Sequence, residues 1–443
     1  MVYLCTSTII YPFSGTELYC VWLRFMGATI GKKVFISPEN GGFREIDFMN
    51  IGNNCVMMTP NIHAHYTDHG KLQFCPVKLE DGCEINIGAT VMPLTTYGKN
   101  CRLRPFAVTV KGQHCEENTS YEGNPCKAVK APSEKVAVLF AGQGSQYPGM
   151  LDSLTHNEEA KKLLKTACEH LDMNIEEICS ITADTKAIEN TRIAQPIVFV
   201  ADLMAAEMMR QKAALDFSKT IAVAGYSLGE LSALCFAKAI SYKDALSLVK
   251  VRADAMASCN GGSMCNLRGA SRKDADNLAK KFKCKIANIV SDHHDQIERN
   301  LYVIAGPSSS IDHLISHVNV DVEGGLRAKK LRVSAAFHTN DMKQAQLKFK
   351  QALENVKISL PSDVLVYSNV TGRPYSSEEE IRRLLPLQIS SPVQWHGTVL
   401  DMVEKEGISK FIECGPMDTL SKMLSLIFPD ITSDKILTSD DCN

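Results

Sequence analysis

An apolar residue recurs every six positions between residues 79 and 103, and this period limits the folds open to the chain more than any other feature. The repeating residues are Leu79, Ile85, Val91, Tyr97 and Leu103. Four positions after each of them stands a small residue, namely Cys83, Ala89, Thr95, Cys101 and Ala107. A six-residue period suits a coil with three short faces, whose apolar and small side chains point inward and stack coil on coil. The pattern therefore predicts a β-helix.

The cysteines support a division of the chain into two regions. Of 16 cysteines, eight precede residue 130, and no C-x-x-C motif is present. Free cysteine behaves as a small buried hydrophobe, so it suits the cramped inward position of such a coil. We interpret the cysteines as reduced thiols without a metal-binding or disulfide framework.

Length and composition exclude several classes of protein. A chain of 443 residues predicts two or three domains, and 45% hydrophobic with 22% charged residues is the balance of globular proteins. The net charge of −2 gives no reason to expect nucleic-acid binding. No apolar run approaches the roughly 18 to 20 residues of a membrane span, and no targeting signal is evident. We expect a cytoplasmic protein, with a mitochondrion or plastid left open, and Met1 need not be the biological start.

A second region, after residue 134, contains a candidate nucleophile. Residues 135–140 predict a buried strand that leads into the glycine-containing turn 141–146. Residues 220–224 predict another strand, followed by Gly225-Tyr-Ser-Leu-Gly229 and a helix over 230–239. A G-x-S-x-G turn between a strand and a helix exposes the Ser227 hydroxyl and directs the Leu228 N–H toward an oxyanion.

Two further residues fit the same chemistry. A serine needs a base, and the alternating run of residues 331–339 predicts that His338 lies at the end of a strand. Arg252 lies on a helix that begins after Ser241, where Ser241 and Asp244 form a variant of the capping box.

Together these motifs resemble malonyl-CoA:acyl carrier protein transacylases and the acyltransferase domains of polyketide synthases, over about residues 135–428. The matching segments are 141–146, 194–196, 225–229, 251–256, 333–338, 367–370, 391–395 and 413–416. The resemblance implies a domain over 135–435 with an α/β-hydrolase-like core and an inserted ferredoxin-like subdomain at about 260–333.

The resemblance also implies roles for individual residues. Ser227 is the nucleophile, His338 the base, and Arg252 the clamp for the substrate carboxylate. The implied oxyanion-hole amides are those of Gln143 and Leu228, and the residues expected to orient the base are Gln388 and Asn369. Phe337 precedes the base as in malonyl-selective polyketide acyltransferases, so its ring is expected to disfavour methylmalonyl.

The first region resembles the hexapeptide-repeat left-handed parallel β-helix of many acyl- and sugar-modifying transferases, over residues 18–128. Its start at residues 22–31 is similar to the terminal β-helix of some amino-acid-activating synthetases. Such domains usually form trimers, so the resemblance implies a homotrimer. His63, His65 and His69 lie where the six-residue register breaks; we favour a solvated loop, and a catalytic histidine is the alternative.

The sequence thus predicts a two-domain protein, a left-handed β-helix followed by an α/β acyltransferase. It would act as an acyl-carrier-protein S-malonyltransferase that moves malonyl from malonyl-CoA to an acyl carrier protein. A thioester hydrolase on the same fold, and a scaffold with a silent transferase domain, are the alternatives. We expect no cofactor and no metal; the cluster Asp292-His-His-Asp295 is interpreted as a solvated loop, since adjacent residues on an extended chain point to opposite sides.

Overall fold

The computed structural model describes residues 13–37, 45–129, 135–210, 219–319 and 325–429, and the backbone of Ile436–Leu437. The chain divides into two compact units, Met1–Ser133 and Glu134–Asn443. Each unit contains its own cluster of buried hydrophobic residues.

Short parallel strands form most of the first unit, after helix α2 (Glu17–Phe25). One sheet contains β1 (Thr29–Ile30), β3 (Met49–Ile51), β8 (Val77–Leu79), β11 (Thr96–Tyr97) and β13 (His114–Cys115). A second contains β2 (Phe35–Ser37), β4 (Val56–Met58), β9 (Glu84–Ile85), β12 (Arg102–Leu103), β14 (Ser120–Glu122) and β15 (Lys127–Val129). A third contains β5 (Asn61–Ile62) and β10 (Thr90–Val91).

The register of these strands follows the six-residue period of the sequence. Tyr97 pairs with Leu79 and with Cys115, each 18 residues away, which is three repeats. All ten apolar and small residues of the repeat are buried. The thiols fit the inward positions because they also donate to backbone carbonyls, as Cys83 Sγ does to Gly98 O at 3.2 Å.

A hairpin interrupts this regular stacking. Ile51 pairs with Leu79, 28 residues later, and the extra chain forms the antiparallel pair β6 (His65–Asp68) and β7 (Lys71–Phe74). The sequence analysis expected a loop with solvated histidines here. His69 is exposed, but the prediction is wrong for His65, whose Nδ1 lies 2.8 Å from Oε1 of Glu45, because a carboxylate is available beside the hairpin.

A parallel sheet forms the centre of the second unit. Its order is β22 (Leu365–Val366), β17 (Thr220–Gly225), β16 (Val136–Phe140), β23 (Lys410–Cys414) and β24 (Ile436–Leu437). All five residues of β16 are buried, which explains its continuous apolar sequence. The α-helices of this part are α3 (Glu158–Leu171), α4 (Ile175–Ile178), α5 (Thr185–Glu189), α6 (Thr191–Arg210), α7 (Gly229–Phe236), α8 (Tyr242–Ala257), α11 (Lys343–Glu354), α12 (Glu378–Leu387), α13 (Trp395–Leu400) and α14 (Thr419–Ile427).

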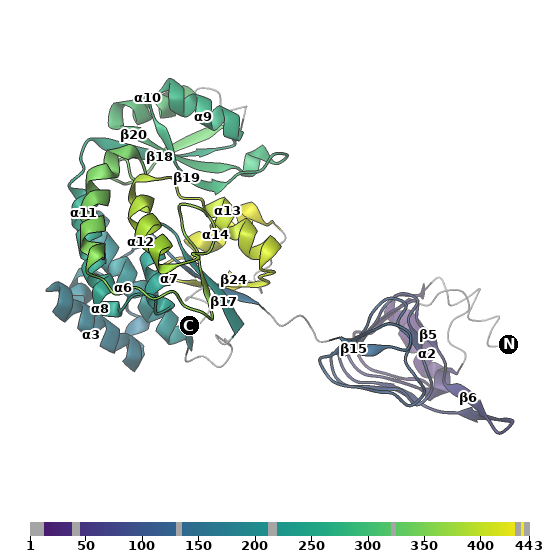
Figure 1. The fold of residues 1–443 in the computed structure, drawn as a ribbon. Coiled ribbons are helices and arrows are strands. Elements are labelled where there is room, and N and C mark those ends of the chain that lie inside the picture. Colours follow the sequence, from purple (N-terminus) through teal and green to yellow (C-terminus); the bar gives the residue numbers. More distant parts are fainter. Residues whose placement is uncertain are drawn as a thin grey trace. The chain divides into compact units, whose positions relative to one another are not determined.

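An inserted subdomain follows α8 and lies at the top of the second unit in Figure 1. It runs β18 (Gly262–Arg268), α9 (Arg272–Lys281), β19 (Lys285–Ser291), β20 (Leu301–Pro307), α10 (Ser308–Val318) and β21 (Arg327–Lys330). The strands are antiparallel in the order β19, β20, β18, β21, which is a ferredoxin-like βαββαβ arrangement.

The Asp292–Asp295 cluster joins this subdomain to the rest of the unit. Asp292 accepts a hydrogen bond from the Tyr302 hydroxyl, and His293 Nε2 lies 2.9 Å from Leu426 O at the end of α14. Its first two residues are therefore half-buried structural contacts, not the solvated loop that was expected, because the loop packs on a neighbouring helix. Within the described ranges, no group of three His, Cys, Asp or Glu side chains is placed to hold a metal ion.

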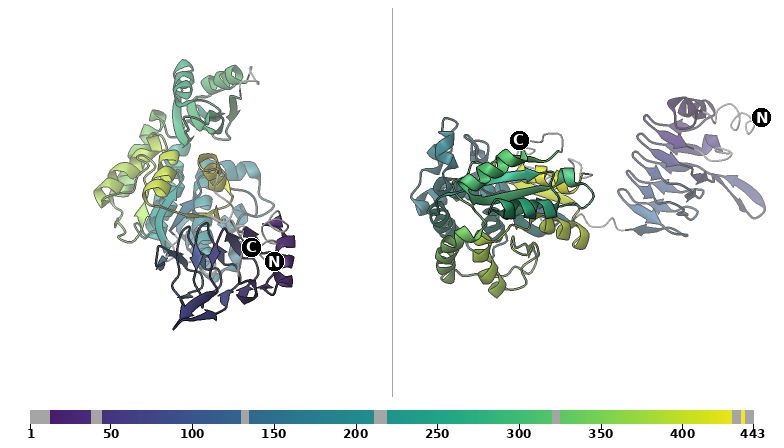
Figure 2. Two further views of the ribbon diagram at one scale, coloured as in Figure 1. Left: turned by 90° about the vertical axis from the view of Figure 1, so that its right-hand side faces the viewer. Right: turned by 90° about the horizontal axis from the view of Figure 1, so that it is seen from above.

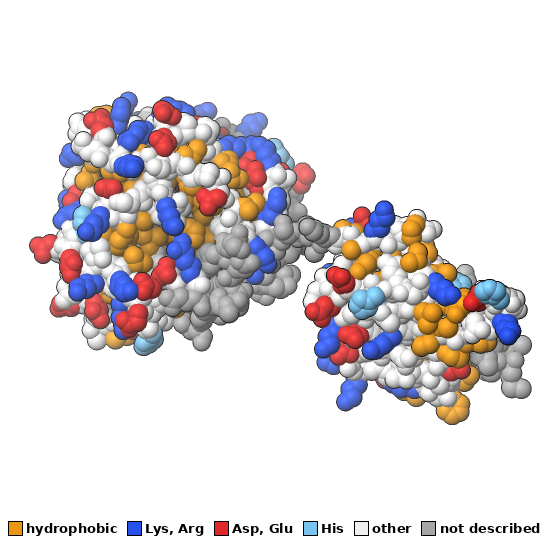
Figure 3. Space-filling model, turned by 60° about the horizontal axis from the view of Figure 1, so that its bottom comes forward, with side chains coloured by type: hydrophobic (Ala, Val, Ile, Leu, Met, Phe, Trp, Pro, Cys, Tyr) orange, Lys and Arg blue, Asp and Glu red, His pale blue; other side chains and the backbone are white. Residues whose placement is uncertain are grey.

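The surface charges agree with the near-neutral composition. On the face shown in Figure 3, Lys and Arg side chains are interspersed with Asp and Glu on both units. Each helix in the described part of the chain is too short or too polar to span a bilayer.

Candidate active site

The nucleophile elbow lies between β17 and α7. Ser227 has φ +57°, a left-handed conformation that costs energy for a non-glycine residue and raises its side chain above the sheet. A Cβ on Gly225 would lie 1.9 Å from the Gly229 carbonyl carbon, and one on Gly229 would lie 2.2 Å from Phe140 O. Only glycine at both positions permits this close turn.

His338 is in direct contact with the serine. Its Nε2 lies 2.7 Å from Ser227 Oγ, and its Nδ1 lies 2.7 Å from the main-chain oxygen of Gln388. A carbonyl only accepts hydrogen bonds, so Nδ1 carries the proton and Nε2 is left to accept the serine O–H. The imidazole is thus held in the tautomer of a general base.

The backbone around His338 differs from the prediction. The residues from 331 to 338 form no strand; β21 ends at Lys330, and His338 lies in a loop with φ +60°. Leu331 and Val333 are half-buried, Arg332 and Ser334 are exposed, and residues 335–339 are buried, all without strand pairing.

Burial controls the charge of the base. The pKa of His338 is lowered from 6.5 to about 4. Removal from water is the larger cause, and the positive charge of Arg252 is the second. The imidazole is therefore neutral, and competent to accept a proton, throughout the physiological range.

Arg252 reaches the same oxygen from α8. Its Nη2 donates to Ser227 Oγ at 3.1 Å and to Gln388 Oε1 at 3.0 Å, and its Nη1 donates to Gln195 Oε1 at 2.8 Å. Burial lowers the pKa of Arg252 to about 10, so the guanidinium stays charged at neutral pH. A fixed cation beside the nucleophile suits an anionic group on the substrate.

Two buried residues of the site were missed by sequence reasoning. Gln195, on α6, holds Arg252, and Glu230, on α7, accepts from Gln388 Nε2 at 3.2 Å and from the hydroxyl of Tyr375. Burial raises the pKa of Glu230 to about 7. The only sequence signal for Glu230 was its position directly after the elbow, where an acidic residue ordinarily lies exposed at a helix N-terminus.

Asn369 was expected to orient the base, but its side chain bonds the backbone of the elbow instead. Its Oδ1 accepts the Ser227 backbone N–H at 2.7 Å, and its Nδ2 donates to Gly225 O at 2.7 Å. Asn369 follows β22, which pairs with β17, and is therefore placed to brace the elbow. The structure brings it to the nucleophile, whereas the contact with the base comes from Gln388.

The remaining predicted residues lie around this centre. Leu228 is buried directly before α7, and Gln143 follows β16, with its Nε2 donating to Thr191 Oγ1 at 3.2 Å. β16 pairs with β17, so both backbones reach the same edge of the sheet. Phe337 is buried next to the base.

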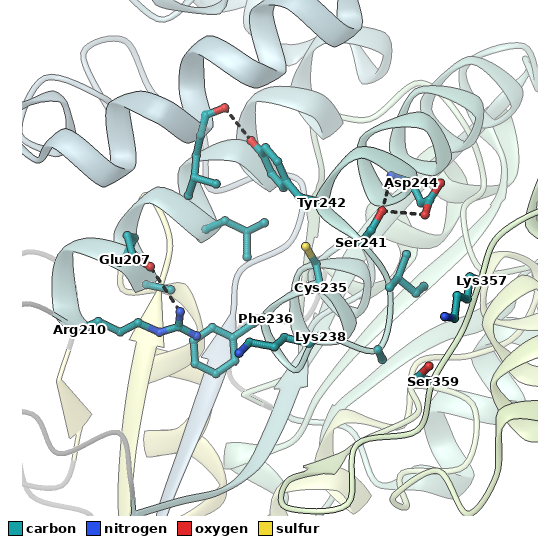
Figure 4. A pocket seen from close by; sticks show the side chains of 15 residues that line it. Glu207, Arg210, Cys235, Phe236, Lys238, Ser241, Tyr242, Asp244, Lys357 and Ser359 are labelled. Atoms are coloured by element: carbon teal, nitrogen blue, oxygen red, sulfur yellow. Dashed lines mark hydrogen bonds and ion pairs between the residues drawn. The ribbon is translucent and has the colours of Figure 1, made fainter.

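A large cavity of about 540 Å³ lies elsewhere in the unit. Figure 4 shows its lining, in which Arg210 lies against the ring of Phe236 and pairs with Glu207 at 3.3 Å. Phe236 ends α7, which begins beside Ser227, so the cavity is about one helix length, roughly 12 Å, from the nucleophile. None of the reactive residues lines it.

A second cavity, of about 430 Å³, lies beside Thr191, which accepts a hydrogen bond from Gln143. It is lined by residues before and at the start of α6, including Thr191, and by residues 331–334 of the loop that leads to His338. Lys186, Arg192 and Arg332 line it together with Glu189, which pairs with Arg332 at 3.0 Å, and Arg192 pairs with Asp254 at 3.2 Å.

Comparisons with known proteins agree on one family. The model of the acyl transferase domain matches residues 138–427. A protein of Drosophila melanogaster, named a probable mitochondrial malonyl-CoA-acyl carrier protein transacylase, is 34% identical over 307 residues, 67% of this chain and 80% of its own.

Solved structures give the same result. The acyl-carrier-protein S-malonyltransferase of Bartonella henselae is 29% identical, with a TM-score of 0.62 over 70% of this chain and 97% of its own. A malonyl transacylase solved with its type II polyketide acyl carrier protein is 26% identical, with a TM-score of 0.60 over 69% of this chain and 94% of its own.

Proposed function

Because the chain belongs to the family of acyl transferase domains, we propose that it moves a malonyl group from coenzyme A to the phosphopantetheine thiol of an acyl carrier protein. It is an acyltransferase that forms a malonyl-serine intermediate on Ser227. The observation that carries this proposal is that Ser227 Oγ lies within hydrogen-bond distance of both His338 Nε2 and Arg252 Nη2. One atom thus faces a base and a cation for the substrate carboxylate.

The first half-reaction acylates the serine. His338 Nε2 takes the hydroxyl proton as Ser227 Oγ attacks the thioester carbonyl, and the oxyanion is stabilised by the backbone N–H groups of Gln143 and Leu228. When the C–S bond breaks, the proton on Nε2 passes to the coenzyme A sulfur, which leaves as a thiol.

The second half-reaction reverses these roles. The thiol of the carrier gives its proton to His338 Nε2 and attacks the malonyl ester, and the proton returns to Ser227 as the C–O bond breaks. These steps need only protein groups, so we propose that the enzyme uses no metal or cofactor beyond its thioester substrate.

Charge supports the choice of substrates. Arg252 would hold the free malonyl carboxylate as a bidentate pair, which an acetyl group cannot form. Arg192 and Arg332 line the second cavity, where they pair with Asp254 and Glu189, and their guanidinium groups would exchange these carboxylates for the phosphates of coenzyme A or of the carrier's phosphopantetheine.

A single-turnover experiment with labelled malonyl-CoA tests this function. We expect intact-mass measurement to show one malonyl adduct on the protein, absent from Ser227→Ala, and the label to appear on an acyl carrier protein thiol when this is added. An adduct on Ser227→Ala would place the nucleophile elsewhere. Release of the label chiefly into water, with the carrier present, would make the enzyme a hydrolase.

For the first unit we propose a left-handed parallel β-helix of hexapeptide repeats, over about residues 18–128, that assembles the protein as a trimer. The support is the 18-residue register of paired strands and the burial of both residue types of the repeat. We propose domain bounds of 18–128 and 135–435. We also propose a cytoplasmic location, with a mitochondrion or plastid as the alternatives; the Drosophila relative is named as a mitochondrial protein.

A further inference from the structure

Gln388 contacts the base and the cation of the site through different atoms. Its main-chain oxygen lies 2.7 Å from His338 Nδ1. Its side-chain Oε1 accepts from Arg252 Nη2 at 3.0 Å, and its Nε2 donates to Ser227 O at 2.7 Å. The side chain can therefore be changed while the main-chain contact that orients the base is kept.

Glu230 fixes which way the Gln388 amide faces. Glu230 Oε2 accepts from Gln388 Nε2 at 3.2 Å, and Ser227 O is also an acceptor, so both require an N–H. A flipped amide would place its oxygen against these two oxygens and its NH₂ against the donors of Arg252. The carboxylate is itself held by the hydroxyl of Tyr375 and the N–H of Asn369.

This chain of contacts leads to the guanidinium. The side chains that accept from Arg252 are those of Gln195, Gln388 and Ser227, and among the described residues no carboxylate forms an ion pair with it. Glu230, where ionised, attracts Arg252 through space, and it also orients the Gln388 amide whose oxygen faces the guanidinium. Two glutamine oxygens thus set the plane of the guanidinium, and no protein anion competes for it.

We propose that the Gln388 side chain, oriented by Glu230, is the positioning residue that holds Arg252 at Ser227 and so sets the preference for acyl groups ending in a carboxylate. The inference rests on the proposed function. A bidentate pair requires a guanidinium of fixed plane, whereas an acetyl group makes no use of that plane. Loss of the Gln388 amide should therefore affect malonyl transfer more than acetyl transfer.

The test is Gln388→Met in the full chain, which removes the amide at similar volume and leaves the main-chain oxygen for His338. Loss of one charge-assisted hydrogen bond predicts a fall of about 10- to 100-fold in kcat/KM for malonyl-CoA, mostly in KM. The fall for acetyl-CoA should be about tenfold smaller or more, which is the lower end of that range. The acid limb of the pH profile should stay in place, since His338 keeps its partner.

Two companion variants make the result specific. Glu230→Gln keeps an acceptor for the Gln388 amide but removes the charge, so the malonyl-to-acetyl ratio should fall by a smaller factor. Ser232→Ala is the matched control, because Ser232 lies on α7 as Glu230 does, and the change removes its buried 2.7 Å hydrogen bond to Asp202 of α6. Its ratio should equal that of the unmodified enzyme.

Equal losses for both substrates in Gln388→Met would overturn the inference and leave the amide a purely structural role. An acid limb shifted together with the ratio would also overturn it, because the side chain would then act through the base. Should Gln388→Met fail to fold, an unchanged ratio in Glu230→Gln would overturn the inference as well. Absence of a malonyl adduct in the unmodified enzyme would instead refute the proposed function.

Discussion

The pH dependence of acylation gives a sharp test of the buried base. Burial lowers the pKa of His338 to about 4, with a smaller contribution from the charge of Arg252. Only the neutral imidazole can accept the Ser227 proton. At saturating malonyl-CoA, where a loss that falls mostly on KM has little effect, we therefore expect malonyl-Ser227 to form at a nearly constant rate from pH 8 down to pH 5, and at half that rate near pH 4.

The two pKa values predict very different rates at pH 5. With a pKa of about 4, ~90% of His338 is neutral at pH 5, whereas an ordinary histidine with a pKa of 6.5 would be only ~3% neutral. The buried and the solvated base thus differ by about 30-fold in expected rate at this pH. A difference of this size lies well outside experimental error.

The same shift lowers stability in acid. The folded-state pKa lies below the unfolded one, so the unfolded chain binds more protons below pH 6.5, and stability falls as the pH falls toward the folded-state pKa. At pH 5 this cost of the buried histidine is about 2 kcal/mol. Circular dichroism at each pH must therefore confirm that the enzyme remains folded.

The assay is a quenched-flow measurement in which enzyme at pH 7 is jumped to the test pH with malonyl-CoA and the adduct is quantified by intact mass. Arg252→Ala should move the acid limb toward higher pH, because a positive charge that opposes protonation of His338 is removed. Half-maximal acylation near pH 6.5, with the enzyme still folded, would show that the base is solvated, and the argument from burial would be wrong.

Four further predictions concern the base, the two substrate residues and the first unit. His338→Ala should slow adduct formation on the order of hundreds-fold, measured by the same quenched-flow assay; a normal rate would exclude it as the base. Arg252→Ala should lower the malonyl-to-acetyl ratio of kcat/KM, and an unchanged ratio would remove the clamp assignment. The unmodified enzyme should prefer malonyl to methylmalonyl by about 10- to 200-fold, since one methyl group in a pocket is worth that much, and Phe337→Ser should narrow the gap; competition between the two thioesters measures both. Light scattering should give three subunits for the full chain and fewer for a fragment starting at Ser133; two monomers would exclude assembly through the first unit.

Local features of the chain were predictable because short-range physics determines them. The two strands, the elbow and the Ser241 cap of α8 follow from an apolar run, a pair of glycines and a capping residue, each acting within a few positions. The six-residue period likewise predicted which side chains of the first unit are buried. In each case neighbouring residues carry the whole signal.

His338 shows where this approach fails. The alternation of residues 331–338 predicted a strand. A loop that packs on a core can alternate half-buried and exposed residues just as a strand does. Pairing with a neighbouring strand is a tertiary contact that alternation cannot report. His338 was proposed as the base because a serine needs one and histidine is the usual one, and the family resemblance implied the same role; only the element expected to carry it was wrong.

The side-chain contacts behind the nucleophile could not be read from local patterns, and Gln388 and Asn369 were expected there only through the family resemblance. These contacts join residues far apart in the chain: Ser227 meets Asn369 and Gln388 at separations of 142 and 161 residues. Hydrogen bonds of this kind leave no periodicity, and glutamine, asparagine and glutamate are ordinary surface residues. Glu230 in particular has the sequence position of an exposed helix-start acid, yet it is fully buried, and a buried polar group must find partners. The Gln388 amide must donate to Glu230 and accept from Arg252, and only one orientation allows both hydrogen bonds. We therefore propose that the residue whose main-chain oxygen orients the base also sets how the cation faces the substrate.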